Sequence, residues 1–156
     1  KMEPEQVVNL LNIYFDKQTE IVQNFGGDID KFVGDELMAV FKGDKMGNQA
    51  VDCAIKIQEE VQRLNLELGK NIKIGIGINT GAMVMGAMGS KDRMDFTVIG
   101  DNVNLGARLC GAAKAGEIIF SEKTEKILIA DKYNLKKLDP IKVKGKKKPI
   151  QIYRVE

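Results

Sequence analysis

The stretch at residues 26–41 reads GGDIDKFVGDELMAVF, and its pattern decides how the first half of the chain folds. Residues 29–33 alternate between two faces, as the side chains of a strand do. Gly34 and Asp35 follow as a turn pair, and residues 36–41 run back as a second strand. The sequence therefore predicts a β-hairpin with its turn at Gly34-Asp35.

The acidic and basic side chains of this hairpin have two interpretations each. Lys31 lies inside a strand, where a lysine needs a partner or a ligand unless it lies on an open sheet face. Asp35 suits a hard cation such as Mg²⁺, although aspartate is also common in turns. Asp28 and Asp30 flank or interrupt the strand, and we expect both to be solvated.

Apolar periodicity around the hairpin predicts both helices and strands. The expected helices cover residues 4–25, 49–68, 101–113 and 121–129, with Asp101 and Ser121 as N-caps. The further expected strands cover residues 72–78, 82–88, 94–99, 117–120, 141–143 and 150–153. This order favours an α+β fold with a largely antiparallel sheet. Within it, Gly75 and Gly77 let another backbone or a ligand approach the strand closely.

Composition excludes several kinds of chemistry. The 156 residues suit one domain, and the net charge is only +2. The chain has no histidine, which removes histidine-dependent triads and histidine-ligated metals. Cys53 and Cys110 are far apart, so neither a disulfide framework nor a zinc cluster is expected, and both should serve as core or interface residues. Chemistry here must use carboxylates, Lys, Arg, Asn and hydroxyls, with a hard cation as the metal that suits such ligands.

The expected helix at residues 101–113 carries an amide and a guanidinium on one face. Asn104 and Arg108 are four residues apart and therefore neighbours on a helix. Such a pair can grip a phosphate or a ribose, because Arg offers fixed charge and forked donors. The alternative is an exposed Asn beside an Arg that pairs with a nearby Glu. Small neighbours such as Gly106 allow the helix to lie close to the sheet.

Two further features are less informative alone. Thr97 lies on the expected strand just before this helix, where a β-branched residue is ordinary. Residues 143–148 form a lysine-rich run around Lys144, typical of a solvated turn and sometimes of an anion site. The low net charge and the lack of interleaved aromatic residues make a nucleic-acid partner the weaker interpretation.

In order along the chain, these pieces resemble the class III nucleotidyl (adenylyl/guanylyl) cyclase catalytic domain. The matching stretches are residues 3–8, 10–15, 26–41, 75–81, 92–109 and 143–146. The resemblance implies a ferredoxin-like βαββαβ-type core with additional C-terminal strands and helix. It also implies conversion of ATP to 3′,5′-cyclic AMP and pyrophosphate at a site with two Mg²⁺ or Mn²⁺ ions, formed by two copies arranged head to tail.

The resemblance also assigns roles to individual residues. Asp35 matches the second of the family's two metal-binding aspartates. Lys31 and Thr97 match the pair that reads the purine edge, while Lys144 matches the lysine that holds the triphosphate. Asn104 and Arg108 match the residues that orient the ribose and stabilise the developing phosphate charge. The chemistry agrees, since positioning and charge stabilisation are what phosphoryl attack requires.

The residues at the purine positions favour adenine. Adenine N1 accepts a hydrogen bond and its 6-amino group donates one; the Lys31 ammonium donates, and the Thr97 hydroxyl can accept. Guanylyl-type relatives carry an acidic residue at the Lys31 position, whereas this chain does not. Thr97 is similar to a bacterial branch with Thr or Ser there, a branch linked to bicarbonate stimulation.

One family element is missing from residues 1–156. The first metal-binding aspartate belongs to a strand upstream of the first helix, and this chain begins at Lys1 after that point. We therefore expect a single, N-terminally truncated catalytic domain that is weak or inactive as it stands. We expect its parent to be a cytoplasmic or membrane-attached cyclase with a regulatory domain. Mn²⁺-supported cyclic AMP formation by residues 1–156 at the parent's rate would contradict this expectation.

Two alternatives stay open at this point. The first is another product, cyclic GMP or cyclic di-GMP. The second is a non-catalytic dimerisation or regulatory module that kept the fold. A third, an RNA-binding ferredoxin-like domain, needs exposed aromatic residues on two central strands, and this chain has no such pattern. The methionines Met83, Met85 and Met88 are expected in a core or at a dimer interface.

Overall fold

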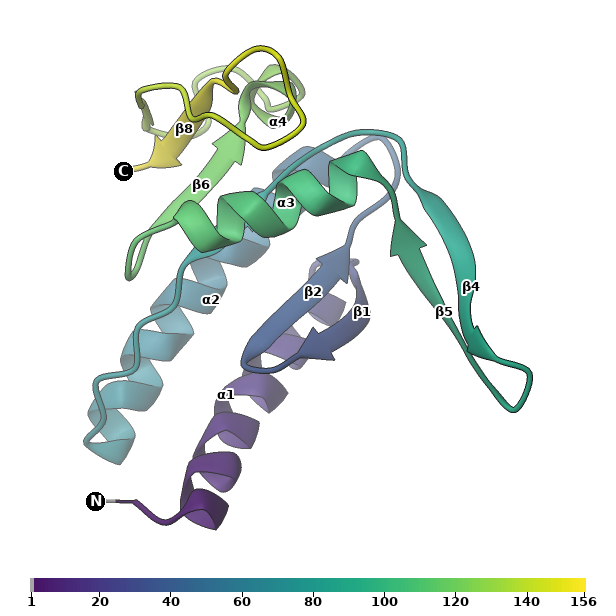
Figure 1. The fold of residues 1–156 in the computed structure, drawn as a ribbon. Helices are drawn as coiled ribbons and strands as arrows, with labels where there is room; N and C mark the ends of the chain where they lie inside the picture. Colours follow the sequence, from purple (N-terminus) through teal and green to yellow (C-terminus); the bar gives the residue numbers. More distant parts are fainter. Residues whose placement is uncertain (1) are drawn as a thin grey trace. The chain divides into compact units, whose positions relative to one another are not determined.

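The computed structural model describes residues 2–156, which divide into two compact units, residues 2–73 and 74–156 (Figure 1). The elements follow one another in the order expected, and the fold is a mixed α+β arrangement. None of the helices among residues 2–156 combines the length and apolar character needed to cross a bilayer. The two units are considered separately below.

The first unit packs two long helices together beside one hairpin. Helix α1 spans Pro4–Asn24 and helix α2 spans Met46–Leu68, each burying one apolar stripe. Tyr14 on α1 donates its hydroxyl to Asn65 Oδ1 on α2 at 2.7 Å. Cys53 is buried on α2, and this burial raises the pKa of its thiol to about 12. The two helices are therefore held together by apolar burial, by the Tyr14–Asn65 hydrogen bond and by an ion pair between Lys17 and Glu60 at 3.9 Å.

The hairpin consists of β1, Asp28–Val33, and β2, Glu36–Val40, as the sequence predicts. Its two-residue turn places Gly34 at φ 60°, a conformation that glycine adopts without steric cost. The strand register skips Asp30, which marks a β-bulge between Ile29 and Lys31. The Asp30 side chain is only 4% exposed, so the expected solvation of Asp30 is wrong. A bulge re-aims side chains, and simple strand alternation does not anticipate it.

The second unit is built on a four-stranded sheet in the order β3-β6-β8-β7. These strands are β3 (Ile76–Ile78), β6 (Ile118–Ser121), β8 (Ile152–Val155) and β7 (Leu135–Lys137). The β3–β6 pair is parallel, and the other two pairs are antiparallel. All four residues of β6 are buried, which suits a strand covered on both faces.

The C-terminal strands are only partly where the sequence predicts them. A strand at residues 141–143 was expected, but there the backbone makes a single bridge, Ile141 with Ile150. Pro140 and Pro149 lie directly before the two bridging residues and cannot donate to a ladder. Besides β6, the strand that pairs with β8 is β7, which precedes the expected strand at residues 141–143 in the sequence.

Two helices complete the second unit, and one of their caps differs from expectation. Helix α3 spans Asp101–Ala112; its N-cap is Gly100 at φ 135°, and Asp101 is the first helical residue. Helix α4 is short, Glu122–Lys126. Ser121 is its N-cap residue, but the Ser121 hydroxyl donates to Asn79 rather than to the helix. The expected position of Ser121 is therefore confirmed, whereas the expectation for Asp101 is wrong because Gly100 occupies the cap position of α3.

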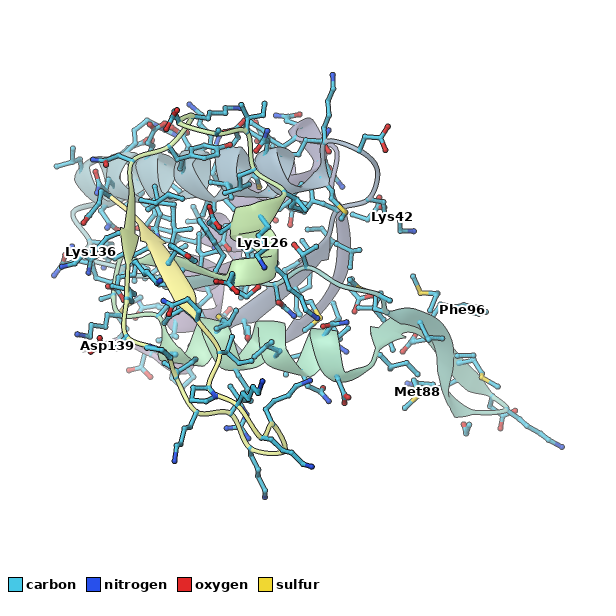
Figure 2. The ribbon with its side chains drawn as sticks, turned by 90° about the horizontal axis from the view of Figure 1, so that it is seen from above. Lys42, Met88, Phe96, Lys126, Lys136 and Asp139 are labelled. Atoms are coloured by element: carbon cyan, nitrogen blue, oxygen red, sulfur yellow. The ribbon has the colours of Figure 1, made fainter. Side chains whose placement is uncertain are left out.

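Strands β4, Val84–Ser90, and β5, Arg93–Ile99, pair with each other and with no other strand among the described residues. Figure 1 shows this hairpin projecting from the start of α3, and we call it the arm. Its apolar side chains are widely exposed, up to 72% for Phe96. Met83, Met85 and Met88 are also exposed, so they do not belong to a core of this chain. Met88 and Phe96 are labelled in Figure 2.

The segment that connects α3 to β6 contains a charged contact made by Glu117. The Glu117 carboxylate accepts the Lys114 backbone N–H at 2.7 Å and pairs with the Arg154 guanidinium at 3.1 Å. The hydrogen bond from the Lys114 amide contributes most to lowering the pKa of Glu117 below its ordinary value of 4.5. The Arg154 guanidinium also lowers this pKa. The charged form therefore stabilises the fold at neutral pH, and that contribution is lost as the pH falls through the lowered folded pKa.

We expect Glu117→Gln to lower the free energy of unfolding by about 1 kcal/mol at neutral pH, because the charge-assisted contact to Arg154 is weakened. Denaturant titrations at several pH values measure this difference. The gap between the two proteins should shrink as the pH drops from 4.5 through the lowered pKa. Glu156→Gln is the matched control, since Glu156 also pairs with Arg154 but is more exposed. A gap that persists unchanged into acid would contradict the assignment.

Candidate active site

The six residues predicted to form the site divide between the two units. Lys31 and Asp35 belong to the hairpin of the first unit. The remaining four belong to the second unit: Thr97 on β5, Asn104 and Arg108 on α3, and Lys144 in the loop before β8. Each group is described within its own unit.

The bulge in β1 sets the surroundings of Lys31. The Lys31 side chain is 37% exposed, and its Nζ lies 3.8 Å from Asp30 Oδ2. The Asp30 side chain is buried beside the lysine, with only 4% of it exposed. Strand alternation does not predict this pairing, because neighbouring residues of a regular strand point to opposite faces.

Asp35 lies at the tip of the hairpin and is exposed. Within residues 2–156 its carboxylate makes no ion pair, and no cluster of three or more metal-ligating side chains is formed. One exposed carboxylate on a rigid two-residue turn still fits Mg²⁺. This ion commonly takes one or two carboxylates from protein and completes its shell with water and substrate phosphates.

Asn104 and Arg108 project from the exposed side of α3. Leu105 and Leu109 on the same helix are buried, at 5% and 0% exposure, which fixes the opposite side in the core. In the described part of the chain, neither the Asn104 side chain nor the Arg108 guanidinium has a side-chain partner. The alternative in which Arg108 pairs with a nearby Glu is therefore not observed. Both groups are available to a ligand.

Lys144 occupies the tip of a tight turn. The Lys146 N–H donates to the Val143 carbonyl at 3.0 Å, and Gly145 takes φ 87° within the turn. Val143 packs against the apolar cluster that contains Leu105 and Leu109 of α3. The turn that presents Lys144 is thus anchored on the buried side of the helix that presents Asn104 and Arg108.

Thr97 differs from its neighbours on the arm. It is 9% exposed, whereas residues 93–96 of β5 are exposed. Thr97 lies opposite Gly86 in the β4–β5 register and only four residues before α3 begins. The structure thus places Asn104 and Arg108 on one helix face, and a short connection joins that helix to Thr97. The Lys144 turn is supported by the apolar cluster that contains Leu105 and Leu109.

Comparisons with known proteins assign the chain to a family. Residues 1–156 match the family model of the adenylate and guanylate cyclase catalytic domain, and the chain belongs to this family. The resemblance drawn from the sequence is therefore confirmed. Domains of this family generally depend on divalent metal ions, bind nucleotides and act as dimers.

Three relatives show which known cyclases the chain is similar to. The chain is 36% identical to an adenylate cyclase of Anabaena cylindrica, over 99% of this chain and 33% of that protein. The chain thus spans about a third of that relative's length. The adenylyl cyclase CyaB from P. aeruginosa superposes with a TM-score of 0.93 at 36% identity, covering 100% of this chain and 85% of that one. The guanylyl cyclase Cya2 gives 0.87 at 33% identity, covering 99% and 82%.

Proposed function

We propose that this chain is the catalytic domain of an adenylate cyclase, which converts ATP to 3′,5′-cyclic AMP and pyrophosphate. The observation that carries the proposal is the exposed Asn104–Arg108 pair on α3, which has no side-chain partner among the described residues. Family membership supports a cyclase reaction, and curated relatives named adenylate cyclase support ATP as the substrate.

In the proposed reaction the ribose 3′-oxygen attacks the α-phosphorus in line with the departing pyrophosphate. The 3′-oxygen loses its proton, a P–O bond forms, and the bond to pyrophosphate breaks. Asn104 orients the ribose through its amide, and Arg108 stabilises the charge that develops on the phosphate. Lys144, at its exposed turn, holds the triphosphate as a point charge.

Divalent ions belong to the proposed site as well. Asp35 is the residue of this chain that would hold such an ion, together with oxygens of the nucleotide. A bound Mg²⁺ or Mn²⁺ would supply acidification of the 3′-hydroxyl and neutralisation of phosphate charge.

Base selection rests on Lys31 and Thr97, because overall similarity does not separate the two substrates. Solved relatives described as adenylyl and guanylyl cyclases are 36% and 33% identical to this chain. Lys31 can donate to adenine N1, and Thr97 can accept from the 6-amino group. The Asp30 carboxylate lies 3.8 Å from Lys31 Nζ, and this ion pair on the strand supports the proposed placement of Lys31 as a donor.

The proposed active unit contains two copies of the chain. We propose a head-to-tail homodimer in which Asp35 of one copy and the Asn104–Arg108 pair of the other share one nucleotide. The arm supports this assembly, since exposed apolar residues of the kind that mark protein contacts lie on both faces of the β4–β5 ribbon and directly before it. These residues are Met83, Val84, Met85, Met88, Met94, Phe96 and Ile99. The proposed cellular setting is the cytoplasm, with regulation supplied by other segments of the parent protein.

Base preference is tested by assaying ATP and GTP side by side in the intact protein that carries this domain. We expect ATP to be preferred, and Lys31→Glu to lower the ATP-to-GTP ratio of kcat/KM by at least about tenfold, because an acceptor replaces the donor facing adenine N1. Lys42→Glu, the same charge change at an exposed lysine outside the hairpin, should leave the ratio unchanged (Figure 2). A GTP preference of the unmodified protein would overturn the assignment.

The shared site is tested by mixing two inactive variants. Asp35→Asn and Arg108→Ala should each lower kcat by about 100-fold or more, since each removes charge stabilisation. When the two are co-expressed, half of the dimers are mixed and each mixed dimer has one intact site. Activity should then recover to about a quarter of the unmodified level. Co-expression of Asp35→Asn with Asp35→Ala is the control, and recovery no better than that control would exclude a site shared between copies.

A further inference from the structure

Helix α3 meets strand β3 along one narrow stripe. The stripe contains Asn102, Gly106, Cys110 and Ala113, which follow one another at three- and four-residue spacing. Opposite it, residues 75–79 present two glycines and then Asn79. A helix and a strand that face each other in this way can approach closely only where their side chains are small.

The C-terminal half of the stripe is fixed by glycine. A Cβ placed on Gly77 would overlap the backbone of Cys110, and one placed on Gly75 would lie 2.9 Å from the Ala113 carbonyl oxygen. The strand and the helix backbones are therefore in direct contact at this end. Any shift of α3 toward β3 is blocked by the backbone itself.

The N-terminal half is fixed by hydrogen bonds instead. Asn79 Nδ2 donates to the Asn102 carbonyl in the first turn of α3 at 2.9 Å. Ser121 Oγ, at the end of β6, donates to Asn79 Oδ1 at 2.6 Å and so fixes the orientation of the amide. Asn102 Nδ2 in turn donates to the Ala82 carbonyl at 2.8 Å. The ends of two strands and the start of α3 thus converge on one amide.

The functional pair lies on the other side of the same helix. Asn104 follows Asn102 by two residues, as Arg108 follows Gly106, which is a rotation of about 200° around the helix. The face that contacts β3 therefore determines the direction in which the Asn104 amide and the Arg108 guanidinium point. A small rotation of the first turn would move Asn104 away from its place beside the ribose.

We infer that Asn79, held by Ser121, is a positioning residue that fixes the first turn of α3 and thereby orients Asn104 toward the nucleotide. This inference rests on the proposed cyclase function for its consequence in catalysis. Its geometric part, the anchoring of the first turn of α3, stands independently. Effective attack needs reacting groups held within a fraction of an ångström, so loss of the anchor should slow the chemical step.

The test variant is Asn79→Asp, which keeps the size of the side chain and the acceptor for Ser121 but removes the donor to Asn102. In the intact protein we expect kcat to fall by about tenfold or more, with KM for ATP changed by less than about twofold. Ser121→Ala leaves the Asn79 donor in place and should have the same effect in weaker form. The kcat of each variant is expressed per folded molecule, and circular dichroism measures the folded fraction.

The chain offers a matched control one residue away. Thr80 Oγ1 and Thr124 Oγ1 lie 2.8 Å apart, which ties the end of β3 to α4 rather than to α3. Thr80→Val removes this buried contact and should lower stability, yet it should leave kcat per folded molecule unchanged. If Thr80→Val and Asn79→Asp lower kcat equally, Asn79 has only a general structural role and the inference fails.

A double-mutant cycle separates positioning from stability further. If Asn79 acts through Asn104, Asn79→Asp should cost less than about threefold in kcat when Asn104→Ala is already present. A merely structural effect would multiply to the same factor in both backgrounds. That result would overturn the inference while leaving the proposed function intact.

Hydrogen exchange tests the anchor without any activity. The Asn104 N–H donates to the Gly100 carbonyl at 3.1 Å, so its exchange reports opening of the first turn. Asn79→Asp should speed exchange at residues 104–106 more than Thr80→Val does. Equal exchange in the two variants would overturn the inference. If the unmodified protein forms no cyclic nucleotide, the proposed function fails, and this measurement still decides whether Asn79 anchors α3.

Discussion

The second unit depends on the direct contact between β3 and α3. Side chains normally separate a helix from a sheet, but Gly75 and Gly77 remove that spacer, and the helix backbone lies against the strand. The contact leaves little room for α3 to slide or roll, because protein interiors resist small changes of volume. Polar chemistry can then be displayed on the far side of α3 with a defined direction. Leu105 and Leu109 fill the core beside this contact, and the Lys144 turn rests on the same apolar cluster.

The hairpin of the first unit uses a different device. Its two-residue turn presents Asp35, while the bulge in β1 brings the buried Asp30 carboxylate beside the Lys31 ammonium. A lysine inside a strand is expensive unless it has a partner, and here the partner is its own neighbour. Under the proposed function, this arrangement presents the Lys31 ammonium as a donor to the purine base, with the Asp30 carboxylate 3.8 Å away.

Most of the fold was predictable from local patterns, whereas the contacts that orient the site were not. Alternation and the Gly34-Asp35 pair gave the hairpin, and helical spacing gave α1, α2 and α3, because each pattern reports burial of one face. Solvation of Asp30 was wrongly expected, because a bulge depends on how two strands pair. Asn79 was missed for a similar reason, since its partners Ser121 and Asn102 are distant in sequence. Its only sequence signal is a polar residue at the end of an apolar strand.

The arm places sulfur where oxidants can reach it. Met85, Met88 and Met94 are each more than half exposed, whereas the Cys53 thiol is buried and stays protonated with a pKa of about 12. A peroxide that meets this domain therefore encounters thioethers before it encounters that thiol. Sulfoxide formation turns a flexible apolar side chain into a polar one, and methionine sulfoxide reductases reverse the change. The exposed apolar surface of the arm is thus also a surface whose polarity the redox state of its surroundings can alter.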